Sequence, residues 1–245
     1  GTTRIADGTL ALAGTGSIAG SAKIEVHSGA TLDLTETNGT YEIQSGQTIT
    51  GSGTIRGRSA MEAGSFLSPG SGLGILRYDG DLTLNGAELL VDIQSDAGPG
   101  TGHDSIEFLS GELTLGGTPR ITVDLGGFSP EPGIAYTVLG GFENEVTDGF
   151  DPTVLVRNPG EGFGTGFFRV DYHLGGIALT FVRESGGLEG DLDGDGLVGS
   201  SDLDIVRAHW GQSVEPGCVS CGDPSKDGLV GSADLDIIRA NWGAI

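Results

Sequence analysis

The sequence is poor in positive charge. Its 245 residues include 12 lysines and arginines against 34 aspartates and glutamates, a formal net charge of -22. A nucleic-acid-binding surface needs a stripe of cations to face the phosphates, and a surface that binds anionic lipid needs the same charge. The composition therefore argues against nucleic acid and against an anionic membrane surface as partners.

Long apolar runs, aromatic residues and cysteines are scarce too. No run reaches the ~18 apolar residues that predict a membrane-spanning helix, so we expect no membrane insertion. No secretion signal is visible, and we expect the chain to be a processed product. Only 19% of the residues are charged and 36% are hydrophobic, which favours a folded core over a charged, disordered chain.

Glycine is abundant instead, with 47 residues, and it separates many short runs of alternating polar and apolar residues. Runs at 23–27, 31–34, 41–44, 47–50 and 53–56 follow this period of two, which is typical of strands with one buried face. They recur about every 6 to 10 residues, more densely than the ~8 to 12 of β-sandwiches. The pattern predicts a parallel β-solenoid, in which short strands are joined by glycine corners.

From about residue 75 the predicted strands lengthen, as at 89–93, 120–125 and 177–182, and the large aromatic residues concentrate. The pattern does not decide between a continued solenoid and a sandwich. A change of architecture near residue 75 therefore stays open within a β-rich region predicted for residues 1–183.

This region resembles the passenger regions of bacterial surface proteins that carry autotransporter-associated β-strand repeats. The resembling segments are Ser-Gly-Ala-Thr-Leu-Asp-Leu at 28–34, Leu-Ser-Pro-Gly at 67–70, Gly-Asp-Leu-Thr-Leu at 80–84, Asp-Ser-Ile at 104–106 and Ala-Tyr-Thr-Val-Leu at 135–139. The resemblance covers roughly residues 8–183. It implies a right-handed parallel β-helix that displays, adheres or builds surface structure, with an extracellular or cell-surface location.

After a predicted linker at 184–189 comes a tandem repeat. Residues 190–211 and 222–243 align with an offset of 32, and 16 of the 22 aligned positions are identical. Each copy opens on a 12-residue loop with oxygen-bearing residues at positions 1, 3, 5 and 12 and glycine at position 6, which is the spacing of a calcium-binding EF-hand loop. We call residues 190–245 the C-terminal module.

The spacing assigns candidate calcium ligands, because alternate side chains of a tight loop point their oxygens at one centre and calcium takes six to eight oxygens. In the first loop they are Asp191, Asp193, Asp195, Leu197 through its carbonyl, and Asp202. In the second they are Asp223, Ser225, Asp227, Leu229 through its carbonyl, and Asp234. We expect two calcium ions, with weaker binding at the second loop because Ser225 stands where the first has Asp193.

An amphipathic helix is predicted after each loop, with Leu203, Val206 and Trp210 at positions i, i+3 and i+7 and the same spacing in the second copy. Both tryptophans of the chain, Trp210 and Trp242, are expected in the core. Residues 186–245 contain eleven acidic and three basic residues, a net charge of -8. We therefore expect the module to fold poorly without calcium.

Two calcium loops, each followed by one helix, resemble a type I dockerin module over residues 189–245. The resemblance implies calcium-dependent docking to a cohesin domain. The partner-binding residues that it implies are Ser200, Ser201 and Arg207 in one copy, and Ser232, Ala233 and Arg239 in the other. The sequence departs from the cellulosomal pattern in a short gap between the repeats and in Gly199 and Gly231, which replace the usual asparagine.

The chain's two cysteines, Cys218 and Cys221, form a Cys-x-x-Cys motif between the repeats. Such a pair is redox-active, half of a zinc site, or a structural disulfide. No second cysteine pair is present, and a disulfide is favoured in an extracellular chain.

The sequence as a whole favours a non-catalytic, extracellular structural protein. A β-solenoid would form its shaft or display surface. The module would dock it to a cohesin-like domain or to copies of itself, with fibre formation as one outcome. The alternative is a carbohydrate-active enzyme or a glycan-binding protein tethered through the module. Bases are sparse in the β-rich region, which disfavours the enzyme.

Overall fold

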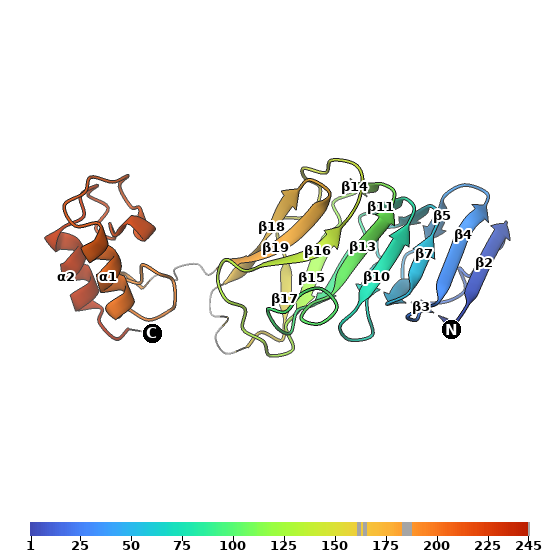
Figure 1. Cartoon of the computed structure of the whole chain (residues 1–245), viewed down its shortest axis with the longest axis horizontal. Helices are drawn as coiled ribbons and strands as arrows, with labels where there is room; N and C mark the ends of the chain where they lie inside the picture. The colour runs from blue at the N-terminus through green and yellow to red at the C-terminus, as the bar shows by residue number, and fades with distance from the viewer. Residues whose placement is uncertain (161–162, 164–165, 183–187, 245) are drawn as a thin grey trace. The chain divides into compact units, whose positions relative to one another are not determined.

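The computed structural model describes residues 1–160, 163, 166–182 and 188–244 (Figure 1). The protein is mainly β, with two α-helices near its C-terminus. It divides into two compact units. The first, here called the β unit, comprises Gly1–Gly162 and Phe168–Phe181, and the second comprises Phe163–Phe167 and Val182–Ile245. Of the predicted linker, residues 184–187 lie outside the described residues.

Three sheets, here called A, B and C, build the β unit. In spatial order, sheet A holds β1 (Thr2–Ile5), β3 (Lys23–Val26), β6 (Thr48–Gly51), β9 (Phe66–Pro69), β12 (Glu88–Asp92), β15 (Arg120–Asp124) and β17 (Leu155–Arg157). Sheet B holds β18 (Phe167–His173), β19 (Gly176–Val182), β16 (Ala135–Gly140), β13 (Ser105–Ser110), β10 (Ile75–Asp79), β7 (Thr54–Arg56), β4 (Thr31–Thr37) and β2 (Thr9–Gly14). Sheet C holds β14 (Leu113–Gly116), β11 (Leu82–Asn85), β8 (Ser59–Met61) and β5 (Tyr41–Ile43).

From β3 to β14 the chain visits sheets A, B and C in turn and then returns to A one strand further along. Each visit pairs in parallel with the one before, as Lys23 with Thr48 and Thr48 with Phe66. Figure 1 shows sheet B as a row of labelled strands advancing from β2 to β16. The parallel pairing runs through residue 75, because β10 pairs in parallel with both β7 and β13. Antiparallel pairing enters where β19 joins β16.

Alternate side chains of the parallel strands stack into a continuous core. In sheet A the in-register row is Ile24, Ile49, Leu67, Leu89 and Ile121, each at most 1% exposed. Burying one such side chain contributes about 1.5–3 kcal/mol. The expected period of two therefore holds because each inward residue packs on the equivalent residues of the neighbouring turns.

Glycine lines the corner between sheets B and C. Gly57, Gly80, Gly111 and Gly141 directly follow β7, β10, β13 and β16, and all four have positive φ. At Gly80, φ is 145° and a Cβ would lie 2.2 Å from the carbonyl oxygen of Gly57. The backbones approach so closely there that no larger residue fits, which accounts for part of the glycine excess.

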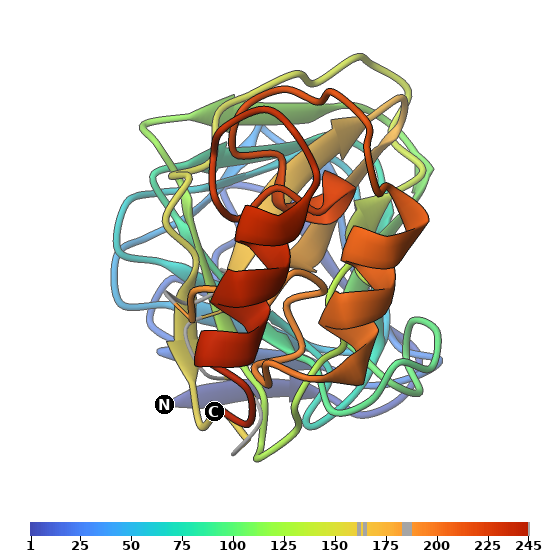
Figure 2. The ribbon, with the colours of Figure 1, turned by 90° about the vertical axis from the view of Figure 1, so that its left-hand side faces the viewer.

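Two halves of similar build form the C-terminal module, each with one helix: α1 (Ser200–Ala208) and α2 (Ser232–Ala240). The helices lie side by side in both views (Figures 1 and 2), and a short 3-10 helix, η2 (Val219–Cys221), lies between them in sequence. Neither helix of the described residues is long and apolar enough to cross a membrane.

The core of the module is small and consists of Leu192, Val198, Val206, Val230 and Ile238. The expectation that both tryptophans belong to it is wrong, since Trp210 is 51% exposed and Trp242 is 53% exposed. The helices end at Ala208 and Ala240, so each tryptophan lies beyond the last helical turn and the i+7 position no longer faces the core.

Candidate metal centre

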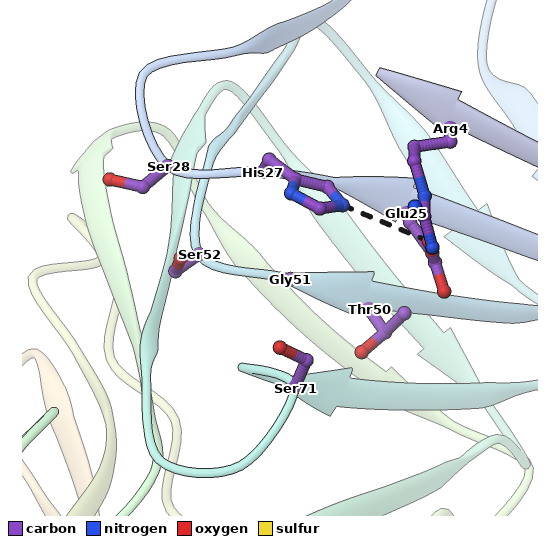
Figure 3. A pocket seen from close by; sticks show the side chains of 8 residues that line it. All are labelled: Arg4, Glu25, His27, Ser28, Thr50, Gly51, Ser52 and Ser71. Atoms are coloured by element: carbon purple, nitrogen blue, oxygen red, sulfur yellow. Dashed lines mark hydrogen bonds and ion pairs between the residues drawn. The ribbon is translucent and has the colours of Figure 1, made fainter. Parts of the chain in front are cut away.

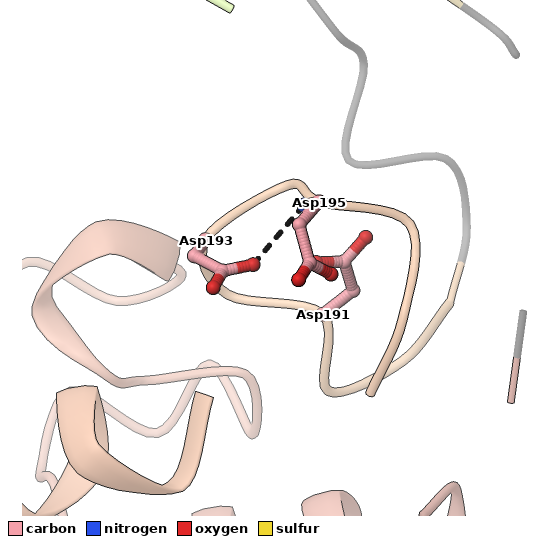
Figure 4. A group of neighbouring side chains, drawn as sticks. All are labelled: Asp191, Asp193 and Asp195. Atoms are coloured by element: carbon pink, nitrogen blue, oxygen red, sulfur yellow. Dashed lines mark hydrogen bonds between the residues drawn. The ribbon is translucent and has the colours of Figure 1, made fainter. Parts of the chain in front are cut away.

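The first loop gathers three carboxylates. Asp191, Asp193 and Asp195 each offer an oxygen, and these oxygens lie within 4.8 Å of one another (Figure 4). Asp191 is buried, whereas Asp193 and Asp195 are exposed, so the group lies at the protein surface and only Asp191 is shielded from solvent. Three carboxylate oxygens around one point are the ligands that a hard cation such as Ca²⁺ takes.

Hydrogen bonds within the loop turn these side chains inward. The carboxylate of Asp191 accepts from the amides of Gly194 (2.8 Å) and Gly196 (3.1 Å). Asp193 accepts from the amide of Asp195 (3.0 Å), and Asp195 from that of Leu197 (2.7 Å). Each carboxylate therefore bends the chain that follows it back on itself, as Asx turns do.

Asp202 stands apart from the three-carboxylate group. It is fully buried, and its Oδ1 accepts from the amides of Leu192 (2.6 Å) and Asp193 (3.2 Å). Its Oδ2 accepts from the amide of Gly199 (2.7 Å), which caps the start of α1. Asp202 thus ties the start of the helix to the start of the loop, and its place among the ligands stays a prediction, as does that of the Leu197 carbonyl.

The electrostatics of the first loop favour a cation. Burial raises the pKa of Asp191, the amides of Gly196 and Gly194 lower it, and the charges of Asp202 and Asp193 raise it again. The net effect is a raised pKa, which means that the ionised carboxylate is destabilised where it stands. A divalent ion among these oxygens would remove that penalty.

The second loop is built alike around Asp223, but its side chains are engaged with one another. Ser225 Oγ donates to Asp223 Oδ1 (3.0 Å), and the amides of Gly217 (3.0 Å), Gly228 (3.0 Å) and Asp227 (3.3 Å) donate to the same carboxylate. Burial raises the pKa of Asp223, but these hydrogen bonds more than offset it and leave the pKa lowered.

Asp234 of the second loop repeats the part of Asp202. Its carboxylate accepts hydrogen bonds from the amide of Ser225 in the second loop (3.1 Å) and from the amide of Gly231 at the start of α2 (2.7 Å). Within the described residues, no group of three metal-ligating side chains forms at the second loop, where Ser225 interrupts the series of carboxylates. The two loops therefore share a backbone plan and differ in ligand charge.

We expect the two loops to bind calcium unequally, with the first at least ~10-fold tighter because it carries one more carboxylate. Calorimetric titration of the chelated 245-residue chain with calcium measures this. Asp191→Asn should remove the tighter phase and Asp223→Asn the weaker one. Loss of the tighter phase in Asp223→Asn would contradict the assignment.

Each loop is tied to the other half of the module. Val198 of the first loop donates its amide to the carbonyl of Ala244 (3.1 Å) and accepts from the amide of Gly243 (2.9 Å). Val230 of the second loop donates to Gln212 (3.0 Å) and accepts from Gly211 (2.8 Å). Since these positions are related by the repeat offset of 32, the segment after each helix holds the opposite loop.

The two cysteines are joined in a Cys218–Cys221 disulfide, so neither sulfur is a free thiol. The bridge adjoins the second loop, because the Cys218 carbonyl accepts from the amide of Asp223 (3.2 Å). The structure thus places the disulfide where it restrains the approach to the first residue of that loop.

All six residues implied as partner-binding are exposed, and they fall at the same places in the two halves: Ser200, Ser201 and Arg207, and Ser232, Ala233 and Arg239. Each arginine pairs with an aspartate one turn earlier, at 3.1 Å for Arg207 and 3.5 Å for Arg239. The exposed Trp210 and Trp242 follow each arginine by three residues. The sequence pattern assigned them to the core and so missed them as surface residues.

Comparison with protein-family models finds no match for this chain, and comparison with curated proteins finds none either.

Proposed function

We propose that the protein is a non-catalytic, extracellular structural or surface protein. Its β unit acts as a parallel β-solenoid shaft or display surface, and its C-terminal module acts as a calcium-bound, dockerin-like docking domain. The observation that carries the proposal is the repeated loop and helix, in which the first loop gathers three carboxylates and both halves leave equivalent surface residues exposed.

The solenoid part rests on the order in which the chain visits the three sheets. Parallel pairing of each turn with the one before, in-register apolar rows and a glycine corner column are what stacked coils require. Such a stack is rigid along its length because every turn is hydrogen-bonded to its neighbours. A rigid rod suits the display or spacing of a docking domain.

A non-catalytic role is supported by the environment of the shifted carboxyls. Burial is the main cause that raises the pKa of Asp104 to about 7. The residue is only 1% exposed, and its carboxylate accepts hydrogen bonds from the amides of Gly74 (2.7 Å) and Asp92 (3.0 Å). A group so enclosed cannot reach a substrate, although its pKa suits acid–base work. We assign it to holding the loop between β12 and β13.

The alternative, a carbohydrate-active enzyme, draws its support from Asp92 and Asp124, which are in register on β12 and β15. Burial and then the charge of Asp124 raise the pKa of Asp92. Asp124, however, accepts from Asn158 Nδ2 at 3.0 and 2.9 Å and from the amide of Gly126 at 2.9 Å, which gives it a structural part in the turn after β15. The pair therefore favours the structural role over catalysis.

Docking is assigned to the surface that each half of the module presents. Each half presents a half-exposed tryptophan near an arginine, and these are residue types in which interaction hot spots are enriched. The partner is a cohesin-like domain or a second copy of this chain. Repetition gives the module two equivalent surfaces, so self-docking at both would build chains of copies.

The test is association of the full chain with calcium present, measured by sedimentation at rising concentration and by binding to a type I cohesin domain. Trp210→Ala or Trp242→Ala alone should leave one surface working. The double variant should weaken association about 30-fold or more, as loss of a hot-spot aromatic residue does. Leu174→Ala removes an 88% exposed apolar side chain of the β unit and is the matched control. A double variant that associates like the unaltered protein, or an unaltered protein that associates with neither partner, would refute the docking role.

A further inference from the structure

A polar pocket of about 240 Å³ crosses the first strands of sheet A (Figure 3). Arg4 on β1, Glu25 on β3 and Thr50 on β6 are in register, and all three line it. The lining is completed by Gly51 at the end of β6 and by His27, Ser28, Ser52 and Ser71, which lie outside the strands. Its volume lies below the ~300–1,000 Å³ of sites for drug-sized ligands, so it suits a single ring-sized group.

Two cations share the one carboxylate that lines this pocket, and Arg4 is the one that lines the pocket itself. Glu25 Oε2 lies 2.7 Å from Arg4 Nε, and its Oε1 lies 2.7 Å from Lys23 Nζ. His27 Nε2 lies 3.8 Å from the same carboxylate. Hydrogen bonds from Lys23 and Arg4 lower the pKa of Glu25 to about 2, so this carboxylate stays ionised, and Lys23, which lies outside the lining, neutralises part of its charge.

Elsewhere in the described parts of the β unit, arginines pair with a carboxylate of their own, as Arg56 with Asp79 at 3.1 Å and Arg77 with Glu107 at 3.0 Å. One carboxylate shared by two cations is thus unusual for a chain of net charge -22. Because Lys23 takes up part of the charge of Glu25, the Arg4 guanidinium, with the His27 ring nearby, favours an anionic group in the pocket over a neutral apolar one.

Three serines also line this pocket. The side chains of Ser28, Ser52 and Ser71 make no hydrogen bond within the described residues, and they come from three different turns around the pocket. The Thr50 hydroxyl donates to the Gly70 carbonyl at 2.6 Å and so is already engaged. The free hydroxyls can each donate and accept, which matches the hydroxyls of a sugar ring.

We propose that this pocket binds a uronic acid unit of an acidic polysaccharide. The sugar carboxylate would be held by the Arg4 guanidinium, whose Nε is oriented by Glu25 while its remaining N–H groups are available, and by His27. The ring hydroxyls would be held by Ser28, Ser52 and Ser71. Because the side chains of Arg4 (62%) and His27 (45%) are exposed to solvent, binding is weak and falls with salt.

The test uses the whole 245-residue chain, loaded with calcium, and takes glucuronic acid, glucose and acetate as probes. Affinity is measured by ligand-observed NMR titration at low salt. Glucuronic acid should bind at least ~10-fold more tightly than glucose, since a charged hydrogen-bond partner contributes about that factor. It should also bind at least ~10-fold more tightly than acetate, which has the carboxylate but lacks the ring hydroxyls. Raising the salt concentration should weaken the binding of glucuronic acid.

Arg4→Gln should weaken glucuronic acid binding about 10-fold. Arg58→Gln is the matched control, since it removes an equally exposed arginine whose nearest carboxylate, Asp81, is 4.0 Å away. The double variant Ser52→Ala, Ser71→Ala leaves the charges intact and should also weaken glucuronic acid binding while leaving acetate binding unchanged.

Three outcomes would overturn the proposal. Glucose binding as tightly as glucuronic acid would remove the role of charge. Acetate binding as tightly would reduce the site to an adventitious anion only. Equal losses in Arg4→Gln and Arg58→Gln would assign binding to general charge. Arg4→Gln is compared only if its thermal unfolding matches that of the unaltered chain, and otherwise the serine variant decides. None of these outcomes depends on docking through the C-terminal module.

Discussion

Removal of calcium should unfold the C-terminal module and leave the β unit folded. Residues 186–245, which include the module, carry a net charge of -8, and the first loop holds three carboxylates with oxygens within 4.8 Å of one another. Two calcium ions would offset four units of that charge. Without them, like charges would face each other around a core of only five buried apolar side chains.

Magnitudes support unfolding over mere loosening. A ligand present at 100 times its dissociation constant stabilises the folded state by ~2.7 kcal/mol, so two sites contribute about 5 kcal/mol. A core in a unit below about 70 residues rarely supplies more than ~3–5 kcal/mol. Loss of both ions therefore cancels most of the stability that the module has.

The measurement is thermal unfolding in calcium and in excess chelator, followed by tryptophan fluorescence and by circular dichroism in the far ultraviolet. Trp210 and Trp242 are the two tryptophans of the chain, so fluorescence reports on the module and not on the β unit. Chelation should abolish the fluorescence transition and the helical signal, whereas the strand signal should persist.

The double variant Asp191→Asn, Asp195→Asn should lower the module's unfolding temperature in calcium. Glu215→Gln removes one charge from an exposed side chain between the loops and is the control. Identical fluorescence and melting curves with and without chelator would refute a calcium-dependent fold.

Gly80→Ala should destabilise the β unit by about 2–5 kcal/mol. A residue with a Cβ at positive φ costs roughly 1–2 kcal/mol, and forcing an atom into a packed site adds about 1–3 kcal/mol. Both costs apply here, because φ is 145° and the new Cβ would lie 2.2 Å from the Gly57 carbonyl oxygen. The neighbouring atom is backbone, so it cannot move aside without disturbing the next turn.

Gly29→Ala is the matched control. Gly29 also has positive φ, at 81°, but nothing lies within 4 Å of the position of its Cβ. It should cost only the ~1–2 kcal/mol of the backbone conformation. Urea unfolding of the full chain, followed through the strand signal in circular dichroism, measures the difference. Equal midpoints for the two variants would show that the corner backbones are not in close contact.

Some of these features follow from local sequence. The strands at 23–26 and 48–51 alternate in polarity, and a strand needs only that alternation and a turn at each end. The loop around Asp191 likewise depends on residues within six positions of one another, since its carboxylates bond to the amides of Gly194 and Gly196. Such short-range patterns could be predicted because their hydrogen bonds are made within the pattern itself.

Other features depend on pairing between distant residues. The sequence near residue 75 did not predict that β10 pairs in parallel with a strand on each side. It also did not predict that antiparallel pairing begins only at β19. The exposure of Trp210 followed from where α1 ends, which the apolar spacing did not reveal. Helix ends and strand partners are chosen by packing against the rest of the chain, which overrides the local period.

By itself, the sequence determined a glycine-punctuated β region and a repeated acidic loop with a helix after each copy. Only the tertiary structure decided which residues meet across turns. Arg4, Glu25 and Thr50 are far apart in sequence and come together because strands β1, β3 and β6 pair in parallel and in register. Val198 meets Gly243 and Ala244 for a similar reason, because each loop hydrogen-bonds to the segment after the opposite helix. Register is set by the burial of every inward side chain at once, and no single segment carries that information.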